Sequence, residues 1–324
     1  MPLTRGRSVR FGGFLHRDSI EAAPSGAASN FTLGPPNEAP TSLLLTSPVC
    51  FTRQTAGMNT AAASLDHVPS ADGTLIACER SGSGPSLVIV NGALSDRRSA
   101  DGLRPHLDPH LTVVTYDRRG RGASGDAPRY APEREMEDLA AVVAATGGNA
   151  FVFGHSSGAI LALEAVLRGL TVKKLGLNEP PFIVGTSRRR PSADLEDRLR
   201  RLIDAGDRES ALHLFLTDAT GLDEAAIGGV RSSPAWPRML EIAHTAAYDA
   251  ALTSGNELPA AERLASLRPP TLVLNGDKTA PWIQMTAAAL AAAVPGARRE
   301  VLAGQAHNPD PGILAKALLA FFTN

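Results

Sequence analysis

Short apolar runs alternate with longer segments of helical pattern along most of this sequence. Residues 87–90, 111–116 and 151–153 are rich in aliphatic and aromatic side chains and do not alternate apolar with polar positions. Such runs are typical of strands that are buried on both faces. Helical patterns, such as residues 132–145 and 157–168, separate them. The alternation predicts the α/β class, with a mostly parallel central sheet and helices on both faces.

The rest of the chain continues this order with one interruption. Further strands are predicted at residues 74–80, 172–177, 271–274 and 299–302, and further helices at residues 282–293 and 310–322. Residues 191–267 contain helical patterns but no convincing strand. We therefore expect a core built from residues 58–185 and 268–324, with residues 186–267 inserted as a helical cap.

Residues 1–57 differ from the rest of the sequence. They are rich in Pro, Gly, Ser, Asn and Thr and show no sustained period. Their only apolar cluster is too short for the apolar region of a signal peptide. We expect a disordered leader, or an upstream extension that is not translated if Met58 is the true initiator.

Charge and composition exclude several classes of function. With 32 basic and 33 acidic residues the net charge is -1, so no basic field attracts nucleic acid or an anionic membrane. The two cysteines are too few for a disulfide scaffold or a Cys-rich zinc site. The chain shows no metal-ligand spacing and no glycine-rich phosphate loop, so we expect no metal and no cofactor. The expectation is a soluble, cytoplasmic protein that acts on a small molecule, with no signal for its oligomeric state.

The strongest chemical signal is the sequence Gly-His-Ser-Ser-Gly at residues 154–158, between a predicted strand and a predicted helix. At such a sharp turn the two glycines leave room for the backbone, and the serine is held at the carboxyl end of the sheet. This context predicts Ser156 as a nucleophile. A serine hydroxyl needs a base, and His307 is the only one of eight histidines that follows the last predicted strand. His307 is therefore the expected general base.

Taken in chain order, these motifs resemble the α/β-hydrolase superfamily. They are Asn91-Gly92, the segment Tyr-Asp-Arg-Arg-Gly-Arg-Gly-Ala-Ser at residues 116–124, the serine turn and His307. The sequence looks most like cap-bearing serine esterases and cofactor-free haloperoxidase-like members, from about residue 66 to the C-terminus. The resemblance implies an α/β-hydrolase fold in which residues 116–124 form a structural turn. It also implies an oxyanion hole formed by the backbone N–H groups of Ala93 and Ser157.

The sequence leaves the acid that would orient His307 open between two residues, with the absence of a functional acid as the third alternative. In many relatives the acid stands three residues after the glycine that ends the strand at 271–274, but Thr279 occupies that position here. The second location in the superfamily, just after the strand that follows the nucleophile helix, is occupied by Glu179, which we favour. Asp277 is the alternative acid. Its non-catalytic interpretation is a loop cap bonded to nearby backbone N–H groups.

Together these residues predict a serine hydrolase that cleaves a small-to-medium ester or similar acyl compound through an acyl-enzyme intermediate. The alternatives are carbon–carbon bond hydrolysis, lactone opening or perhydrolysis by the same residues, and non-catalytic binding of a small molecule on a hydrolase scaffold. Several residues could line the substrate pocket, but for most of them packing in the core explains the residue type equally well. These candidates are His155, Trp236, His244, Tyr248 and Trp282.

Overall fold

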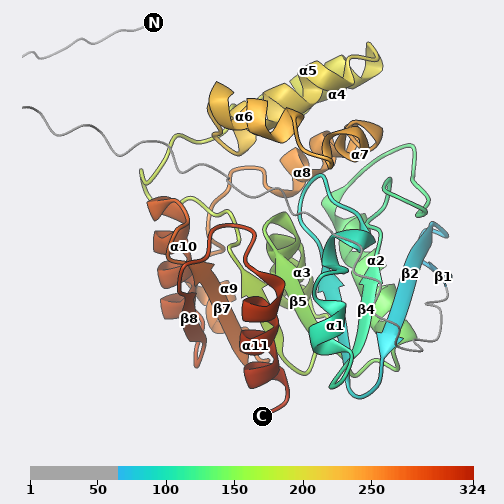
Figure 1. Cartoon of the computed structure of the whole chain (residues 1–324), viewed down its shortest axis with the longest axis vertical. Coiled ribbons are helices and arrows are strands. Elements are labelled where there is room, and N and C mark those ends of the chain that lie inside the picture. The colour runs from blue at the N-terminus through green and yellow to red at the C-terminus, as the bar shows by residue number, and fades with distance from the viewer. Residues whose placement is uncertain (1–64) are drawn as a thin grey trace, which may run out of the picture. The chain divides into compact units, whose positions relative to one another are not determined.

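The computed structural model of the chain describes residues 65–324, and the predicted leader lies outside these residues. An eight-stranded sheet runs through the centre, in the order β1-β2-β4-β3-β5-β6-β7-β8 (Figure 1). β2 (Leu75–Gly82) is antiparallel to both of its neighbours, β1 (Leu65–Pro69) and β4 (Thr112–Tyr116), and the remaining pairs are parallel. This arrangement confirms the predicted mostly parallel sheet.

Every strand predicted from the sequence is present. The parallel strands that follow β4 in the sheet are β3 (Ser86–Val90), β5 (Phe151–His155), β6 (Leu175–Asn178), β7 (Thr271–Gly276) and β8 (Arg298–Leu302). β6 begins three residues later than predicted, after a bend at Lys173. β1 was not predicted, since this exposed edge strand has little of the apolar character that marks buried strands.

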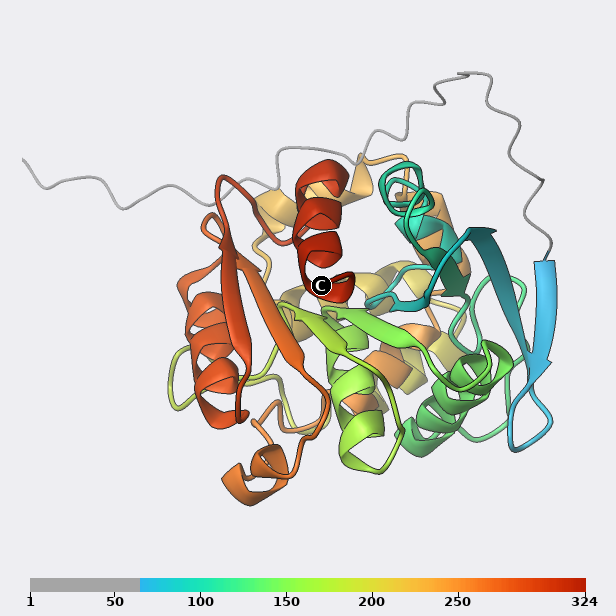
Figure 2. The same cartoon turned by 90° about the horizontal axis from the view of Figure 1, so that it is seen from below.

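Alternate residues of one strand face opposite helical layers. In β3, Val88 and Val90 belong to one buried cluster, whereas Leu87 and Ile89 belong to a second. This is the period of two that a strand imposes on its side chains. Figure 2 shows the two layers of helices on either side of the sheet. The first layer contains α2 (Pro132–Ala145), α3 (Ser157–Leu167) and α10 (Pro281–Ala293), and the second contains α1 (Arg104–Leu107) and α11 (Pro311–Phe322).

A helical insertion separates β6 from β7, as predicted. Between these two strands the structure has no other strand. The insertion has its own apolar cluster, and Ala93 and Leu94 of the loop after β3 pack against it. Its larger helices therefore lie over the carboxyl edge of the sheet (Figure 1). The elements are α4 (Leu195–Asp204), α5 (Arg208–Leu214), η2 (Phe215–Ala219), α6 (Glu224–Arg231), α7 (Trp236–Glu241), α8 (Thr245–Leu252) and α9 (Ala261–Ala265).

Two kinds of feature are absent from the described residues. None of the helices in residues 65–324 is both long and apolar enough to cross a membrane. Within the same residues, no group of three or more His, Cys, Asp or Glu side chains is placed to hold a metal ion.

Candidate active site

The turn between β5 and α3 holds Ser156 in a strained backbone conformation. Ser156 has φ 55° and ψ -124°, a backbone conformation that residues other than glycine rarely adopt. A Cβ on Gly154 would lie 2.5 Å from the Gly158 carbonyl oxygen, and a Cβ on Gly158 would overlap the Val90 carbonyl oxygen. The Ser156 N–H donates to the Asn178 carbonyl oxygen at 2.9 Å. The two glycines thus allow the close backbone contacts that keep the serine at the carboxyl edge of the sheet.

A buried carboxylate lies against the imidazole of His307. Glu179 directly follows β6, is completely buried and has φ 51°. Its Oε2 lies 2.6 Å from His307 Nδ1, and its Oε1 accepts the Gly276 N–H at 2.8 Å. Because an ionised carboxylate can only accept, Nδ1 carries the hydrogen in this pair. The neutral ring then has Nε2 as its proton acceptor.

The other acid considered from the sequence lies elsewhere. Asp277 is exposed, and its Oδ1 accepts the Gly304 N–H at 2.8 Å. Thr279 is buried, and its hydroxyl donates to the Gly276 carbonyl oxygen at 3.0 Å. The structure therefore brings Glu179, and not Asp277, to the imidazole of His307.

His155 lies beside His307. The two ring centroids are 4.9 Å apart, with the planes tilted by 40°. Nδ1 of His155 lies 2.9 Å from the Asn178 side-chain amide nitrogen, which can only donate, so this ring nitrogen accepts. Burial and the neighbouring His307 lower the pKa of His155 to about 3. At neutral pH, His155 is therefore an uncharged side chain that packs beside the imidazole of His307.

Trp282 and Trp236, both candidates to line the pocket, contact arginines. The Arg188 guanidinium lies over the Trp282 ring at 4.6 Å from its centroid, and Arg231 lies over Trp236 at 5.8 Å. Neither ring stacks with His307 in the described part of the chain. Their place in substrate binding stays a prediction.

The other two pocket candidates, His244 and Tyr248, meet the core at the edge of the insertion. Tyr248 stacks on Tyr130 with 4.1 Å between ring centroids, and its hydroxyl donates to Asp126 at 2.8 Å. The His244 ring meets the Tyr248 ring edge-on at 5.9 Å. Burial lowers the pKa of His244. These contacts join the insertion to the core, and a role in the pocket stays a prediction for both residues.

The two expected oxyanion donors belong to segments next to the serine. Ser157 is the first residue of α3, where a backbone N–H has no acceptor within the helix. Ala93 lies in the loop after β3, directly after Gly92. A Cβ on Gly92 would lie 3.0 Å from the Ser156 Cβ, so this loop passes close to the serine. The N-terminus of a helix also favours negative charge.

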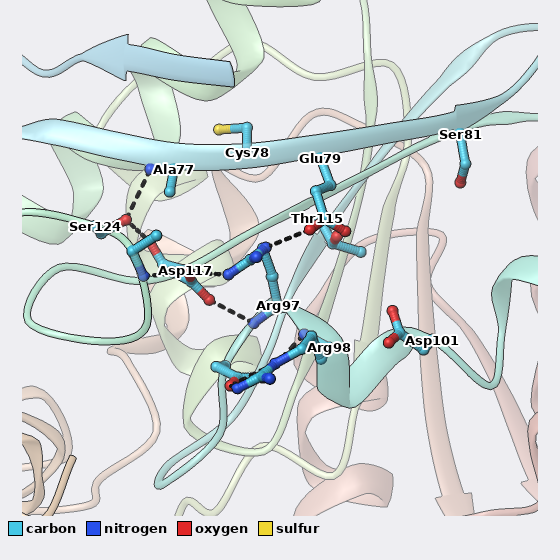
Figure 3. Close-up of polar contacts among 12 residues, drawn as sticks. Ala77, Cys78, Glu79, Ser81, Arg97, Arg98, Asp101, Thr115, Asp117 and Ser124 are labelled. Carbon is cyan, nitrogen blue, oxygen red and sulfur yellow. Dashed lines mark hydrogen bonds and ion pairs between the residues drawn. The ribbon is translucent and has the colours of Figure 1, made fainter. Parts of the chain in front are cut away.

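Residues 116–124 form a turn held by buried polar groups, as the resemblance implied. Asp117 is fully buried and accepts hydrogen bonds from the Arg97 backbone N–H at 2.8 Å and guanidinium at 2.6 Å (Figure 3). Its carboxylate also accepts the Ala123 N–H at 2.8 Å. The Ser124 hydroxyl donates to the Asp117 carbonyl oxygen and accepts the Ala77 N–H (Figure 3). This segment is therefore fixed to β2 and to the loop after β3.

One buried residue in contact with Ser157 was not assigned from the sequence. Asp249 lies in α8 of the insertion, and its carboxylate accepts the Ser157 hydroxyl at 2.8 Å. The available signal was an acid among small apolar residues, in the helix sequence TAAYDAAL. A buried acid indicates a partner but does not identify it, and the partner here is distant in sequence.

The sequence matches the model of a known family. The match is to the Alpha/beta hydrolase family and extends over residues 87–317. The chain belongs to this family. The members with solved structures include an alpha/beta hydrolase from Sphaerobacter thermophilus DSM 20745. It is 47% identical with a TM-score of 0.77, and the match covers 79% of this chain and all of that one.

Two further hydrolases are similar to this chain. One has a lower sequence identity than the Sphaerobacter protein, and the other matches a smaller part of this chain. A thermophilic esterase from Thermogutta terrifontis has the same fold, with 24% identity and a TM-score of 0.64 over 81% of this chain and 98% of that one. An uncharacterised hydrolase of Bacillus subtilis (strain 168), YraK, is 38% identical over 91 residues. That match spans 27% of this chain and only 34% of the length of YraK.

Proposed function

We propose that this protein is a serine hydrolase that cleaves a small-to-medium ester or similar acyl compound through an acyl-enzyme intermediate. The observation that carries the proposal is the buried Glu179 carboxylate, 2.6 Å from His307 Nδ1. It lies at the same edge of the sheet as the strained turn that holds Ser156. Family membership supports hydrolysis as the reaction class.

The residues of the site have distinct roles in the proposed reaction. The Ser156 hydroxyl attacks the carbonyl carbon of the substrate while His307 Nε2 takes its proton. Glu179 holds the proton on Nδ1 and stabilises the imidazolium that forms. The backbone N–H groups of Ala93 and Ser157 stabilise the oxyanion of the tetrahedral intermediate. His307 then protonates the leaving alcohol, and a water molecule, deprotonated by the same imidazole, releases the acid from Ser156.

We propose that the helical insertion acts as a cap over this site. Its apolar cluster packs against Ala93 and Leu94, so it borders the loop that supplies one oxyanion donor. A cap in this position limits the size of the substrate and excludes bulk water from the reacting groups. Candidates for the pocket wall are the neutral His155 and the aromatic side chains Trp236, His244, Tyr248 and Trp282.

A fluorophosphonate probe and a panel of p-nitrophenyl esters test the proposal together. The wild-type protein should be labelled and should hydrolyse the short-chain esters, and Ser156→Ala should abolish both signals. Labelling without ester turnover would contradict the ester substrate and favour lactone opening, perhydrolysis or carbon–carbon bond hydrolysis. A protein that is neither labelled nor active would be a binding protein on this scaffold.

A further inference from the structure

A buried ionic cluster joins the helical insertion to both sides of the candidate oxyanion hole. At its centre is Asp249 of α8, which is fully buried. Its Oδ1 accepts the Ser157 hydroxyl at 2.8 Å and Arg118 Nη1 at 3.0 Å, and its Oδ2 accepts Arg121 Nη2 at 2.7 Å. Burial opposes ionisation of this carboxyl, but Arg121, Arg118 and the Ser157 hydroxyl outweigh it and keep the pKa below its usual value. Asp249 is therefore a fixed negative charge.

The first connection leads from Asp249 through Arg121 to the loop after β3. Arg121 Nη1 donates to the Gly92 carbonyl oxygen at 2.7 Å. This oxygen belongs to the same planar peptide group as the Ala93 N–H, so fixing one end fixes the direction of the other. The hydrogen bond also polarises the peptide group and strengthens its N–H as a donor. The Ser95 hydroxyl donates to the same oxygen at 2.7 Å, so the guanidinium is one of two groups that hold it.

The second connection leads directly to the residue that carries the other donor. The Ser157 hydroxyl donates to Asp249 and accepts a hydrogen bond from Arg118 at 3.2 Å. Ser157 thus begins α3 with its side chain fixed by two charged groups that are themselves buried. The direction of its backbone N–H follows from the position of this first helical residue. One carboxylate of the insertion is therefore connected to both oxyanion donors.

We propose that Asp249 is a positioning residue for the oxyanion hole, a role that rests on the proposed function. It touches no reacting atom and acts through Arg121 and Ser157. A buried ion cluster is a weak source of stability, because desolvation of the charges offsets most of their attraction. The role of this cluster is geometric. The two N–H groups converge on one oxyanion position only if the insertion, the loop after β3 and α3 keep their relative positions, and the cluster holds these three segments together. The oxyanion hole is then complete only with the cap in place.

The chain provides a matched control within the same turn. Arg119, between Arg118 and Arg121 in sequence, is fully buried and pairs with buried Asp138 of α2 through two hydrogen bonds of 2.7 Å. The hydrogen bonds of Arg119 go to Asp138, Asp72 and the Arg134 carbonyl oxygen, and none goes to Gly92 or Ser157. Asp138→Asn therefore removes a buried carboxylate from an arginine of the same motif without touching the oxyanion loop or α3.

The experiment compares Asp249→Asn with Asp138→Asn in the full chain. For each we measure kcat and KM on a p-nitrophenyl ester, and the inhibition constant of a trifluoromethyl ketone, whose adduct with a serine carries an oxyanion. Loss of one oxyanion donor costs about 10²–10³ in kcat. For Asp249→Asn we expect kcat to fall at least about 10-fold, with inhibitor affinity falling in parallel and KM within about 3-fold. For Asp138→Asn we expect kcat and inhibitor affinity within about 3-fold of the wild type.

A second variant covers the case in which Asp249→Asn fails to fold. Ser157→Ala removes the hydroxyl and both of its hydrogen bonds, to Asp249 and from Arg118, but leaves both arginine pairs of Asp249 intact. We therefore expect the same parallel loss of kcat and inhibitor affinity at a smaller, several-fold size. Equal losses in Asp249→Asn and Asp138→Asn, or an unchanged inhibitor affinity in Ser157→Ala, would show that the cluster is merely structural. A wild-type protein without esterase activity and without fluorophosphonate labelling would instead overturn the proposed function itself.

Discussion

Replacing Glu179 by Gln tests whether Glu179, and not Asp277, is the acid that orients His307. The carboxylate uses one oxygen for His307 Nδ1 and the other for the Gly276 N–H. A glutamine amide has one oxygen and one NH₂ group and cannot accept both bonds. If its oxygen stays on Gly276, its NH₂ group faces Nδ1 and moves the imidazole proton to Nε2, where no proton can be accepted from Ser156.

The expected loss of kcat depends on which of two orientations the glutamine amide takes, the one described above or the one flipped by 180°. The wrong tautomer lowers kcat by up to about 10⁴, which corresponds to about 5.4 kcal/mol of barrier. The flipped amide restores the tautomer but leaves the buried Gly276 N–H without an acceptor, at a cost of about 1–3 kcal/mol. It also lacks the charge that stabilises the imidazolium of His307. We therefore expect kcat of Glu179→Gln to fall by about 10²–10⁴, measured on a p-nitrophenyl ester with the melting temperature as the folding control.

Two companion variants complete the test. Asp277→Asn keeps an oxygen for the Gly304 N–H at an exposed position, so kcat should stay within about 3-fold of the wild type. Glu179→Asp keeps the charge and suits the positive φ better, but its shorter side chain cannot reach both partners, so its kcat should lie between those of the wild type and Glu179→Gln. If Asp277→Asn lost as much kcat as Glu179→Gln, or if Glu179→Gln lost less than about 10-fold, the assignment of the acid would be wrong.

Three further predictions follow from the site and its surroundings. Ser156→Ala and His307→Ala should each lower kcat by several orders of magnitude, and the double variant should be little worse because the residues act as a unit; additive losses would contradict this. Gly158→Ala should lower the melting temperature and kcat together, because the added Cβ overlaps the last carbonyl of β3, whereas Gly229→Ala in α6, with nothing within 4 Å, should stabilise the protein by about 0.5–1 kcal/mol. Burial and a neighbouring charge lower the pKa of His155 from 6.5 to about 3, so the unfolded chain binds a proton that the folded one does not, and stability falls as pH drops through this range. His155→Gln should flatten this part of the curve of melting temperature against pH, and an unchanged curve would refute the argument.

The features that depend on neighbouring residues can be predicted from the sequence. Runs such as residues 87–90 predict buried strands because their apolar character shows no alternation, and helix α2 was predicted with the bounds it has in the structure. The turn around Ser156 was also predictable, since its glycines are required within two residues of the serine. The antiparallel β1 was missed because an exposed edge strand leaves little apolar pattern.

Which distant side chains come into contact depends on the packing of the whole fold. Glu179 and Asp277 both follow strands at the carboxyl edge of the sheet, and local sequence gives no distance from either to His307, which is 128 residues from Glu179. Asp249 lies 92 residues from Ser157, in a helix whose pattern shows only that one acid is buried. Such pairings arise when the strands are ordered in the sheet and the insertion packs over their ends. A contact between distant segments is a property of that packing, and no local period or motif encodes it.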